Sequence, residues 1–299
     1  MSYKYTEEEL KKFTAPLTQT EEDRAGNTEK MVRSAIEACD DLKGYTIEVF
    51  PQGSYANNTN VRQNSDVDIC VMLKSVFYGE YPDGLSREDY GFSSSSFTFD
   101  EYRRLVRKAL TDKFKEDYII DGNKSIKIDE NSYHVKADVV PAFQLRDYKN
   151  SGNPAVFVEG IWLKAMKDGS IVKNYPKDHI KNGKEKNKVT GRKYKELVRI
   201  MKHIKNDMCD EGICNGDVIS SFLIECLVWN VPDEYITGYD AWQMRVKNAI
   251  SYLYEQIRDG KHKEWGEVSE HLYLFHRGRK WTAEDVMEFL KTQWNYMGY

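Results

Sequence analysis

The sequence predicts an α+β protein, with a mixed sheet and covering helices in its first half and a helical lobe in its second. The 299 residues are enough for two lobes with a core between them. Helical and strand patterns alternate from about residue 20 to residue 157, after which the strand patterns mostly stop. We therefore expect one domain over residues 1–160 and a second, helical domain over residues 161–299.

Four stretches of the first half have strand patterns. Residues 45–50 alternate and are rich in β-branched and aromatic side chains. Residues 66–73 form an apolar run that follows a polar turn, and we expect a loop after it. Residues 126–128 and 133–140 predict a hairpin, in which Pro141 stops the second strand because proline has no N–H to donate.

Helices are expected before, between and after these strands along the chain. Residues 20–42 have acidic residues in the first turn and apolar residues at helical spacing. A loop over residues 77–96, rich in Gly, Ser, Tyr and Asp, precedes a capping-box pattern of Thr98 with Glu101 that opens the next helix. Later helices are expected over residues 218–230, with Asp217 as the cap, and over residues 239–258 and 282–294.

The charge is unevenly distributed along the chain. The net charge of −4 gives no general reason to bind nucleic acid or an anionic membrane. Residues 177–205, however, hold eleven Lys or Arg and three Asp or Glu, a local net charge of +8. The second half of this stretch has a helical pattern with Lys195, Arg199 and Lys202 on one face. We expect the stretch to attract phosphate; a solvated loop and helix face is the alternative.

The five cysteines are an odd number without the spacing of a disulfide framework, and they predict reduced thiols in a cytosolic protein. Cys209 and Cys214 with His203 would make an incomplete zinc site, because there is no C-x₂-C pair and no clear fourth ligand. No apolar run reaches transmembrane length, and the first residues lack the apolar core of a signal peptide. We therefore expect a cytoplasmic protein without membrane contact.

The stretch from Gly53 to Leu73, which reads GSYANNTNVRQNSDVDICVML, carries the clearest chemical signal. In a strand, Asp66 and Asp68 project from one face while Val67 and Ile69 point into the core. Two carboxylates on one face repel each other unless a cation lies between them. A solvated strand entry is the alternative interpretation of so short a pattern.

Asp138 is the candidate for a third carboxylate that faces the same space. It lies near the end of an apolar strand, where a carboxylate needs a metal ion or a neighbouring Lys or Arg as partner. Gly53 allows the backbone to approach a ligand closely, and Ser54 can offer a hydroxyl and an N–H to a phosphate, although Gly-Ser is also a common turn. These hard oxygen ligands favour Mg²⁺, with Mn²⁺ as the other suitable cation.

Gly-Ser, followed about ten residues later by D-x-D and then by a strand aspartate, resembles the DNA-polymerase-β-like nucleotidyltransferases. Four segments are similar to the bacterial cyclic-oligonucleotide synthases, the CD-NTases: GSYANNTNVRQNSDVDICV, HVKADVVPAF, YKELVRIMKHIK and SSFLIECLVWNVP. These enzymes are relatives of animal cyclic GMP-AMP synthase and oligoadenylate synthase. The resemblance covers nearly the whole chain. It implies a polymerase-β-like core and a C-terminal helical lobe, with the active site in the cleft between them.

The resemblance also implies roles for the matching residues. Asp66, Asp68 and Asp138 would be the catalytic triad and would hold two Mg²⁺ ions. For Lys202 a solvated helix face is the alternative, and for Phe222 a core position. Contacts with the nucleotide would come from Gly53, Ser54 and Lys202 on the phosphate side and from Ser220, Ser221 and Phe222 on the base side.

The implied activity is the joining of NTPs into a cyclic di- or trinucleotide second messenger with release of pyrophosphate; the choice among ATP, GTP, UTP and CTP stays open. The implied setting is anti-phage signalling of the CBASS type, in which the product acts on a separate effector protein and a regulatory partner is encoded in the same operon. The zinc-binding insertion of the animal DNA sensor has no counterpart in this chain. No DNA activator is therefore expected.

Three alternatives stay open at this point. A linear oligonucleotide synthase or terminal nucleotidyltransferase would need the same triad, with a longer basic path for an RNA strand. A transferase that adenylylates a protein or a small molecule usually lacks so large a helical lobe. A nucleotide-binding scaffold without catalysis would gain nothing from three mutually repelling carboxylates.

Overall fold

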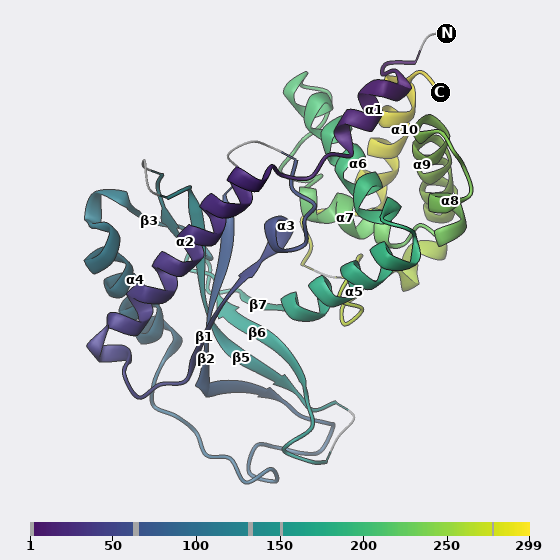
Figure 1. Cartoon of the computed structure of the whole chain (residues 1–299). Helices are drawn as coiled ribbons and strands as arrows, with labels where there is room; N and C mark the ends of the chain where they lie inside the picture. The colour runs from purple at the N-terminus through teal and green to yellow at the C-terminus, as the bar shows by residue number, and fades with distance from the viewer. Residues whose placement is uncertain (1–2, 62–65, 131–133, 150–151, 277) are drawn as a thin grey trace. The chain divides into compact units, whose positions relative to one another are not determined.

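The computed structural model describes residues 3–61, 66–130, 134–149, 152–276 and 278–299, and the chain forms two compact units (Figure 1). The sheet unit comprises Thr18–Tyr55 and Asn64–Lys177, and the helical unit comprises Met1–Leu17, Ala56–Gln63 and Asp178–Tyr299. The chain therefore passes between the units several times. The division at residue 160 stays a prediction.

The sheet unit is built on a mixed sheet. Its strands in the described residues are β1 (Ile47–Gln52), β2 (Val67–Glu80), β3 (Ile119–Asp121), β4 (Ile126–Ile128), β5 (Ala137–Asp147), β6 (Val158–Lys164) and β7 (Ile171–Asn174). The strand order is β1-β2-β5-β4-β3, and β6 and β7 continue from β5. β2 and β5 run parallel, whereas the other neighbouring strands run antiparallel. The predicted α+β class with a mixed sheet is confirmed.

β2 is longer than the sequence predicted. The apolar run ends at Leu73, but the strand continues to Glu80. An irregularity in the register between Leu73 and Phe77 interrupts the ladder, after which β2 pairs with β5 again. The first residues of the predicted loop over residues 77–96 are therefore strand.

β5 passes through Pro141 and ends at Asp147, so the prediction that proline stops this strand is wrong. β4 pairs with β5 as far as Val139, and β6 begins to pair at Phe143. Pro141 lies in the gap between these two partners, where its missing N–H removes no ladder hydrogen bond on that side. The predicted hairpin with β4 is confirmed, while Tyr133 and residues 131–132 lie outside the described residues.

The strands that follow residue 157 were missed by the pattern analysis. β6 and β7 form an antiparallel pair at one end of the sheet. β6 contains Gly160 and ends on Lys164, and β7 has only four residues, so neither shows a clear alternation. The short strand β3 was missed for the same reason.

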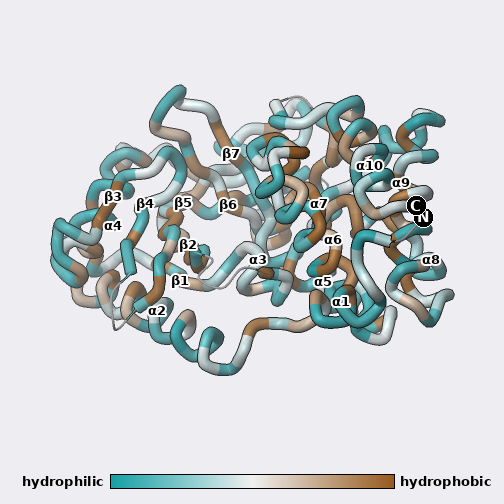
Figure 2. Tube along the Cα trace, turned by 90° about the horizontal axis from the view of Figure 1, so that it is seen from above, coloured by the Kyte–Doolittle hydropathy of each residue, from teal (hydrophilic) through white to brown (hydrophobic). Residues whose placement is uncertain are grey.

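Two helices of the sheet unit, α2 (Gln19–Ala38) and α4 (Phe99–Phe114), pack together and against the sheet (Figure 1). α4 begins with the predicted capping box of Thr98 and Glu101, and α2 begins with a second one. Their inward faces share one core with β2 and β5, and Figure 2 shows apolar residues along β5. Short 3₁₀ turns cover Asp40–Leu42 and Glu116–Tyr118.

The helical unit contains most of the remaining helices. They are α1 (Glu7–Phe13), α5 (Pro176–Val189), α6 (Lys193–Asp210), α7 (Ser221–Trp229), α8 (Asp233–Thr237), α9 (Trp242–Arg258) and α10 (Ala283–Met297), with a 3₁₀ turn at Lys261–Glu264. α5, whose first two residues belong to the sheet unit, was not predicted as a helix. No helix in the described parts of the chain combines the length and the apolarity that a bilayer crossing requires.

Residues from the start of the chain complete the helical unit. Tyr5 and Leu10 are buried in the same core as α6, α7 and α9. The Glu7 carboxylate accepts hydrogen bonds from the backbone N–H groups of Trp242 at 2.6 Å and Gln243 at 3.1 Å, and so caps the start of α9. The N-terminal segment is thus part of the helical unit.

Candidate active site

Asp66 and Asp68 flank the first residue of β2. Val67 and Ile69 are buried, whereas both aspartates are partly exposed. The alternation of the strand therefore separates the carboxylates from the core, as the sequence predicted.

The parallel pairing of β2 with β5 places Asp138 beside Asp68, because these two residues are partners in the register. The Ser125 hydroxyl donates a hydrogen bond to Asp138 Oδ1 at 2.8 Å. Lys127 Nζ lies 3.7 Å from Asp138 Oδ1 and 4.0 Å from Asp66 Oδ2. Asp138 thus lies with Asp66 and Asp68, as predicted. Lys127 is the neighbouring lysine that the sequence offered as the alternative to a metal ion, and it is present as well.

Burial and mutual repulsion make the ionised form of this cluster unfavourable. Burial, together with the negative charges of Asp138 and Asp66, raises the pKa of Asp68 to about 7. The pKa of Asp66 is raised by burial and by Asp138, while Lys127 partly opposes this shift. A cation bound among these carboxylates would remove the repulsion.

Gly53 is required by the geometry behind Asp68. It follows β1 and opens the short helix α3 (Gly53–Ala56), and its φ of +68° lies in the left-handed region. A Cβ atom at this position would lie 2.2 Å from Asp68 Oδ2. Ser54 follows it, partly exposed, in the same turn. Glycine thus allows the Asp68 carboxylate to lie against the backbone of this turn.

Whether a metal ion fits this cluster is judged from the oxygen atoms that the three aspartates offer. No group of three or more His, Cys, Asp or Glu side chains in the described residues is arranged to hold a metal ion. Asp66, Asp68 and Asp138 are nevertheless close enough for Asp138 to raise the pKa of both other carboxyls. Carboxylate oxygens are the ligands that Mg²⁺ prefers, so the residues present fit such an ion.

Lys202 belongs to the helical unit and is 1% exposed. Its Nζ donates to Glu225 Oε2 at 2.7 Å and to the carbonyl and hydroxyl oxygens of Thr59 at 3.1 and 3.0 Å. Lys195 and Arg199 on the same helix are also buried. The alternative of a solvated helix face is therefore wrong, and a phosphate contact of Lys202 stays a prediction.

The predicted base-side residues lie at the start of α7. Ser220 is its N-cap, because the hydroxyl accepts a hydrogen bond from the Leu223 N–H at 3.2 Å; the predicted cap Asp217 does not have this role. Ser221 and Phe222 follow it and are partly exposed. The Phe222 ring packs on the margin of the helical core, with the His179 ring stacked 5.8 Å away.

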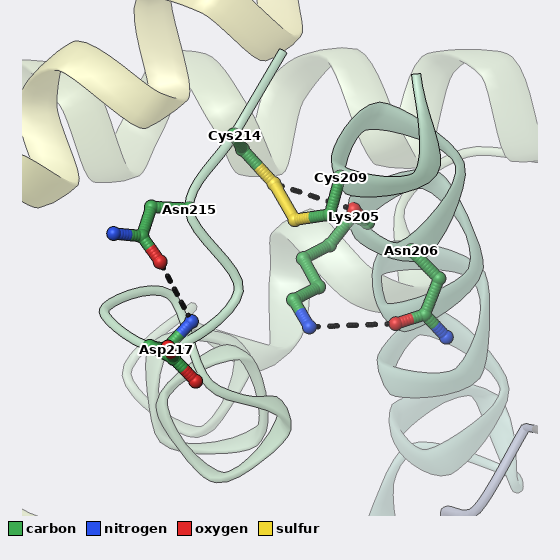
Figure 3. Close-up of a disulfide and its surroundings, with 6 residues drawn as sticks. All are labelled: Lys205, Asn206, Cys209, Cys214, Asn215 and Asp217. Atoms are coloured by element: carbon green, nitrogen blue, oxygen red, sulfur yellow. Dashed lines mark hydrogen bonds between the residues drawn. A yellow bond between two sulfur atoms is a disulfide. The ribbon is translucent and has the colours of Figure 1, made fainter. Parts of the chain in front are cut away.

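The prediction of reduced cysteines is wrong for one pair. Cys209, in the last turn of α6, forms a disulfide with Cys214 (Figure 3). The helix ends at Asp210, and the following turn brings the two Cα atoms to 4.5 Å, within disulfide range. Cys39, Cys70 and Cys226 are free and buried, as expected.

The sequence analysis did not single out Ser125, Lys127, His179 or Glu225. Glu225 gives the clearest signal in retrospect, because it is the one charged residue of the apolar helix α7. A buried carboxylate needs a cation or several donors, so a partner had to exist. Which residues supply it could not be read from the sequence, since they lie up to 168 positions away.

Asp66, Asp68 and Asp138 lie together at the start of the adjoining strands β2 and β5 of a mixed sheet, an arrangement that fits a nucleotidyltransferase. Two family models match the chain: a nucleotidyltransferase domain over residues 32–166 and a cGAS/DncV-like nucleotidyltransferase C-terminal helical domain over residues 181–298. The chain belongs to the cGAS/DncV-like nucleotidyltransferases, the CD-NTases, as the resemblance predicted.

Individual relatives are similar over nearly their whole length. The chain is 46% identical to the cyclic dipyrimidine nucleotide synthase CdnE of Cecembia lonarensis, covering 99% of both chains. It is 39% identical to a protein of the same name from Legionella pneumophila, covering 97% of both. The solved structure of the Rhodothermus marinus CdnE c-UMP-AMP synthase with Apcpp and Upnpp matches with a TM-score of 0.86 and 29% identity, covering 99% of this chain and 97% of that one.

Proposed function

We propose that the chain joins nucleoside triphosphates into a cyclic dinucleotide or trinucleotide and releases pyrophosphate. The observation that carries this proposal is the cluster of Asp66, Asp68 and Asp138, with Gly53 directly behind it. The names of the relatives, all cyclic nucleotide synthases, support a cyclic product. In the reaction, a ribose hydroxyl of one nucleotide attacks the α-phosphorus of another in line and displaces pyrophosphate; the second such transfer closes the ring of a dinucleotide and the third that of a trinucleotide.

Asp66, Asp68 and Asp138 would hold two Mg²⁺ ions, or Mn²⁺, whose chemistry is to lower the pKa of the attacking hydroxyl and to neutralise triphosphate charge. The chain itself fixes the donors. Ser125 orients the Asp138 carboxylate through its hydrogen bond, and Lys127 balances part of the negative charge. The packing of Asp68 against Gly53 limits the positions open to its oxygens.

Several of the predicted residues would supply the nucleotide contacts. Gly53 and Ser54 would bind the donor triphosphate, because the glycine leaves the backbone accessible and the serine adds a hydroxyl. On α7, Ser221 and the partly exposed ring of Phe222 would contact a base by hydrogen bonding and stacking, with Ser220 as the cap that starts this helix. Lys202 would contact phosphate only by exchanging one of its present oxygen partners.

UTP and CTP are the substrates that the comparisons favour. The relatives at 46% and 39% identity are both named cyclic dipyrimidine nucleotide synthases. Other relatives carry different bases in their names, among them a cyclic UMP-AMP synthase at 31% identity. ATP and GTP therefore belong in the same test.

The cellular role that we propose is the one that the resemblance to the family implies. The cyclic product would act in the cytoplasm as a second messenger of anti-phage defence, by switching on a separate effector protein, and a regulatory partner from the same operon would control the synthase. No DNA activator is expected, because the zinc-binding insertion of the animal sensor has no counterpart in the sequence.

The test is a synthesis assay with labelled NTPs. The protein is incubated with each NTP and each pair in Mg²⁺ or Mn²⁺, then treated with phosphatase, and the surviving products are separated. A phosphatase-resistant product that is absent with Asp66→Ala and Asp138→Ala, but present with the exposed control Asp112→Asn, supports the proposal. A ladder of linear products would indicate a linear oligonucleotide synthase instead, and label on protein would indicate a transferase that modifies proteins. No turnover with any NTP combination would overturn the proposed enzymatic function.

A further inference from the structure

A short polar segment follows the Gly53–Ser54 turn in the chain but belongs to the helical unit. Asn57 and Thr59 are fully buried there, and Asn60 is 4% exposed. Buried polar side chains need hydrogen-bond partners. The helices of this unit supply them at Asn57 and Thr59.

Glu225 on α7 is the centre of these contacts. Its Oε2 accepts from the Thr59 hydroxyl at 2.6 Å and from Lys202 Nζ at 2.7 Å. Its Oε1 accepts from the Asn57 amide and lies 2.9 Å from His179 Nε2. Burial on its own would raise the pKa of Glu225, but Lys202 and His179 hold it well below the usual range. The buried Glu225 carboxylate thus contacts Lys202, His179 and two side chains of the polar segment.

Two further contacts hold the backbone of the same segment. Arg199 Nη1 donates to the Asn58 carbonyl at 2.7 Å, and Lys202 Nζ donates to the Thr59 carbonyl at 3.1 Å. On α5, a Cβ atom at Gly183 would lie 2.7 Å from the Asn57 side chain, so a larger residue there would displace Asn57. Side chains and backbone of the segment are therefore fixed by α5, α6 and α7.

We propose that Glu225, with Lys202 and His179, forms a positioning cluster that holds Asn57 and Thr59 and thereby sets the conformation of the Gly53–Ser54 turn. Thr59 is only five residues from Ser54, so its position restricts the turn through the intervening backbone. Through the turn, Glu225 and His179 would act on triphosphate binding without touching the nucleotide. This inference rests on the proposed function of that turn.

Thr59→Val is the sharpest variant, because it keeps the side-chain volume and removes the hydroxyl that contacts both Glu225 and Lys202. Thr59 is fully buried, so the change reaches a nucleotide only through the chain. We expect the KM for NTP to rise about tenfold with kcat within about threefold, which is the signature of lost substrate binding. We also expect faster hydrogen exchange at the backbone N–H groups of residues 53–55 in the nucleotide-free protein.

Thr190→Val is the matched control. Thr190 is also buried in the helical unit, and its hydroxyl bonds to the Lys186 carbonyl and the Tyr194 N–H, outside the cluster. This variant should lose stability without a change in KM or in exchange at residues 53–55. Glu225→Gln, which removes the central charge, should reproduce the effect of Thr59→Val on both readouts or exceed it.

The proposal is overturned if Thr59→Val leaves KM and the exchange at residues 53–55 at wild-type values, or if Thr190→Val changes both equally. The exchange measurement needs no substrate. A protein that converts no NTP would therefore overturn the proposed function, while exchange at residues 53–55 would still decide whether the cluster holds the turn.

Discussion

Asp68 is a carboxyl of the candidate site whose charge is unfavourable in the metal-free protein. Its pKa is raised to about 7 by burial and by the two neighbouring aspartates, so the ionised side chain destabilises the metal-free protein at neutral pH. In metal-free buffer at pH 8, we expect Asp68→Asn to increase the free energy of unfolding by up to about 4 kcal/mol, the equivalent of about three pKa units. Urea unfolding in EDTA measures this change.

The same variant should lose the response to metal. If the three carboxylates bind Mg²⁺ as proposed, the ion would stabilise the folded wild type by mass action. We expect Mg²⁺ to raise the melting temperature of the wild type and of the control Asp112→Asn, but to have little effect on Asp68→Asn. An Asp68→Asn protein that is less stable than the wild type in EDTA would contradict the electrostatic interpretation.

Lys195 gives a prediction about pH. It is 6% exposed, and burial lowers the pKa of its ammonium group to about 8. Because the unfolded state binds this proton more tightly, the contribution of Lys195 to the free energy of unfolding should rise between pH 8 and about pH 10.5. We expect Lys195→Met to remove this rise and to stabilise the protein at pH 7 by up to about 3 kcal/mol. Urea unfolding at pH 7 and pH 10 tests this, with the exposed Lys188→Met as the unaffected control.

At the scale of helices and strands, the sequence predicted the features that depend only on residues close together in the chain. The Thr98 capping box and the D-x-D pattern at the start of β2 could be read from residues within a few positions. β5 continues through Pro141 because β4 stops pairing with β5 before this residue and β6 starts pairing after it. No local pattern contains that information, because it arises from the packing of distant strands.

The candidate site divides in the same way. The three aspartates and Gly53 were predicted, since repelling carboxylates and a glycine turn have a recognisable chemistry. The burial of Lys202 was not predicted. Its partners Thr59 and Glu225 lie 143 and 23 positions away, and the same helical spacing suits a solvated face equally well. Which side chains pair over such separations in the sequence depends on the tertiary fold.

The disulfide between Cys209 and Cys214 ties the end of α6 to the loop before α7. It closes a short loop, for which chain entropy predicts a stabilisation of about 2 kcal/mol. We expect the reductant TCEP to lower the free energy of unfolding by about this amount in the wild type. The double variant Cys209→Ser with Cys214→Ser should be equally stable with and without TCEP. A wild type that ignores TCEP would show that the bond contributes nothing.

At the scale of the whole molecule, the two units do not follow the order of the chain. The helical unit takes Tyr5 and Leu10 into its core and uses Glu7 to cap α9, although these residues lie far from it in sequence. Chain segments that are remote in sequence but buried in one core usually unfold together. We therefore expect one cooperative transition for the helical unit that includes the N-terminal segment.

The fragment of residues 161–299 tests this expectation together with the predicted domain boundary. It lacks Tyr5 and Leu10, whose burial stabilises the core by about 2 kcal/mol each, and it lacks the cap on α9, worth about 1 kcal/mol. We expect its urea midpoint to lie well below that of the full chain. A synthetic peptide of residues 1–17 should raise that midpoint, whereas the same peptide with Tyr5→Ala and Leu10→Ala should not. A fragment with the midpoint of the full chain would show that residues 161–299 fold independently and that the N-terminal segment contributes little to their stability.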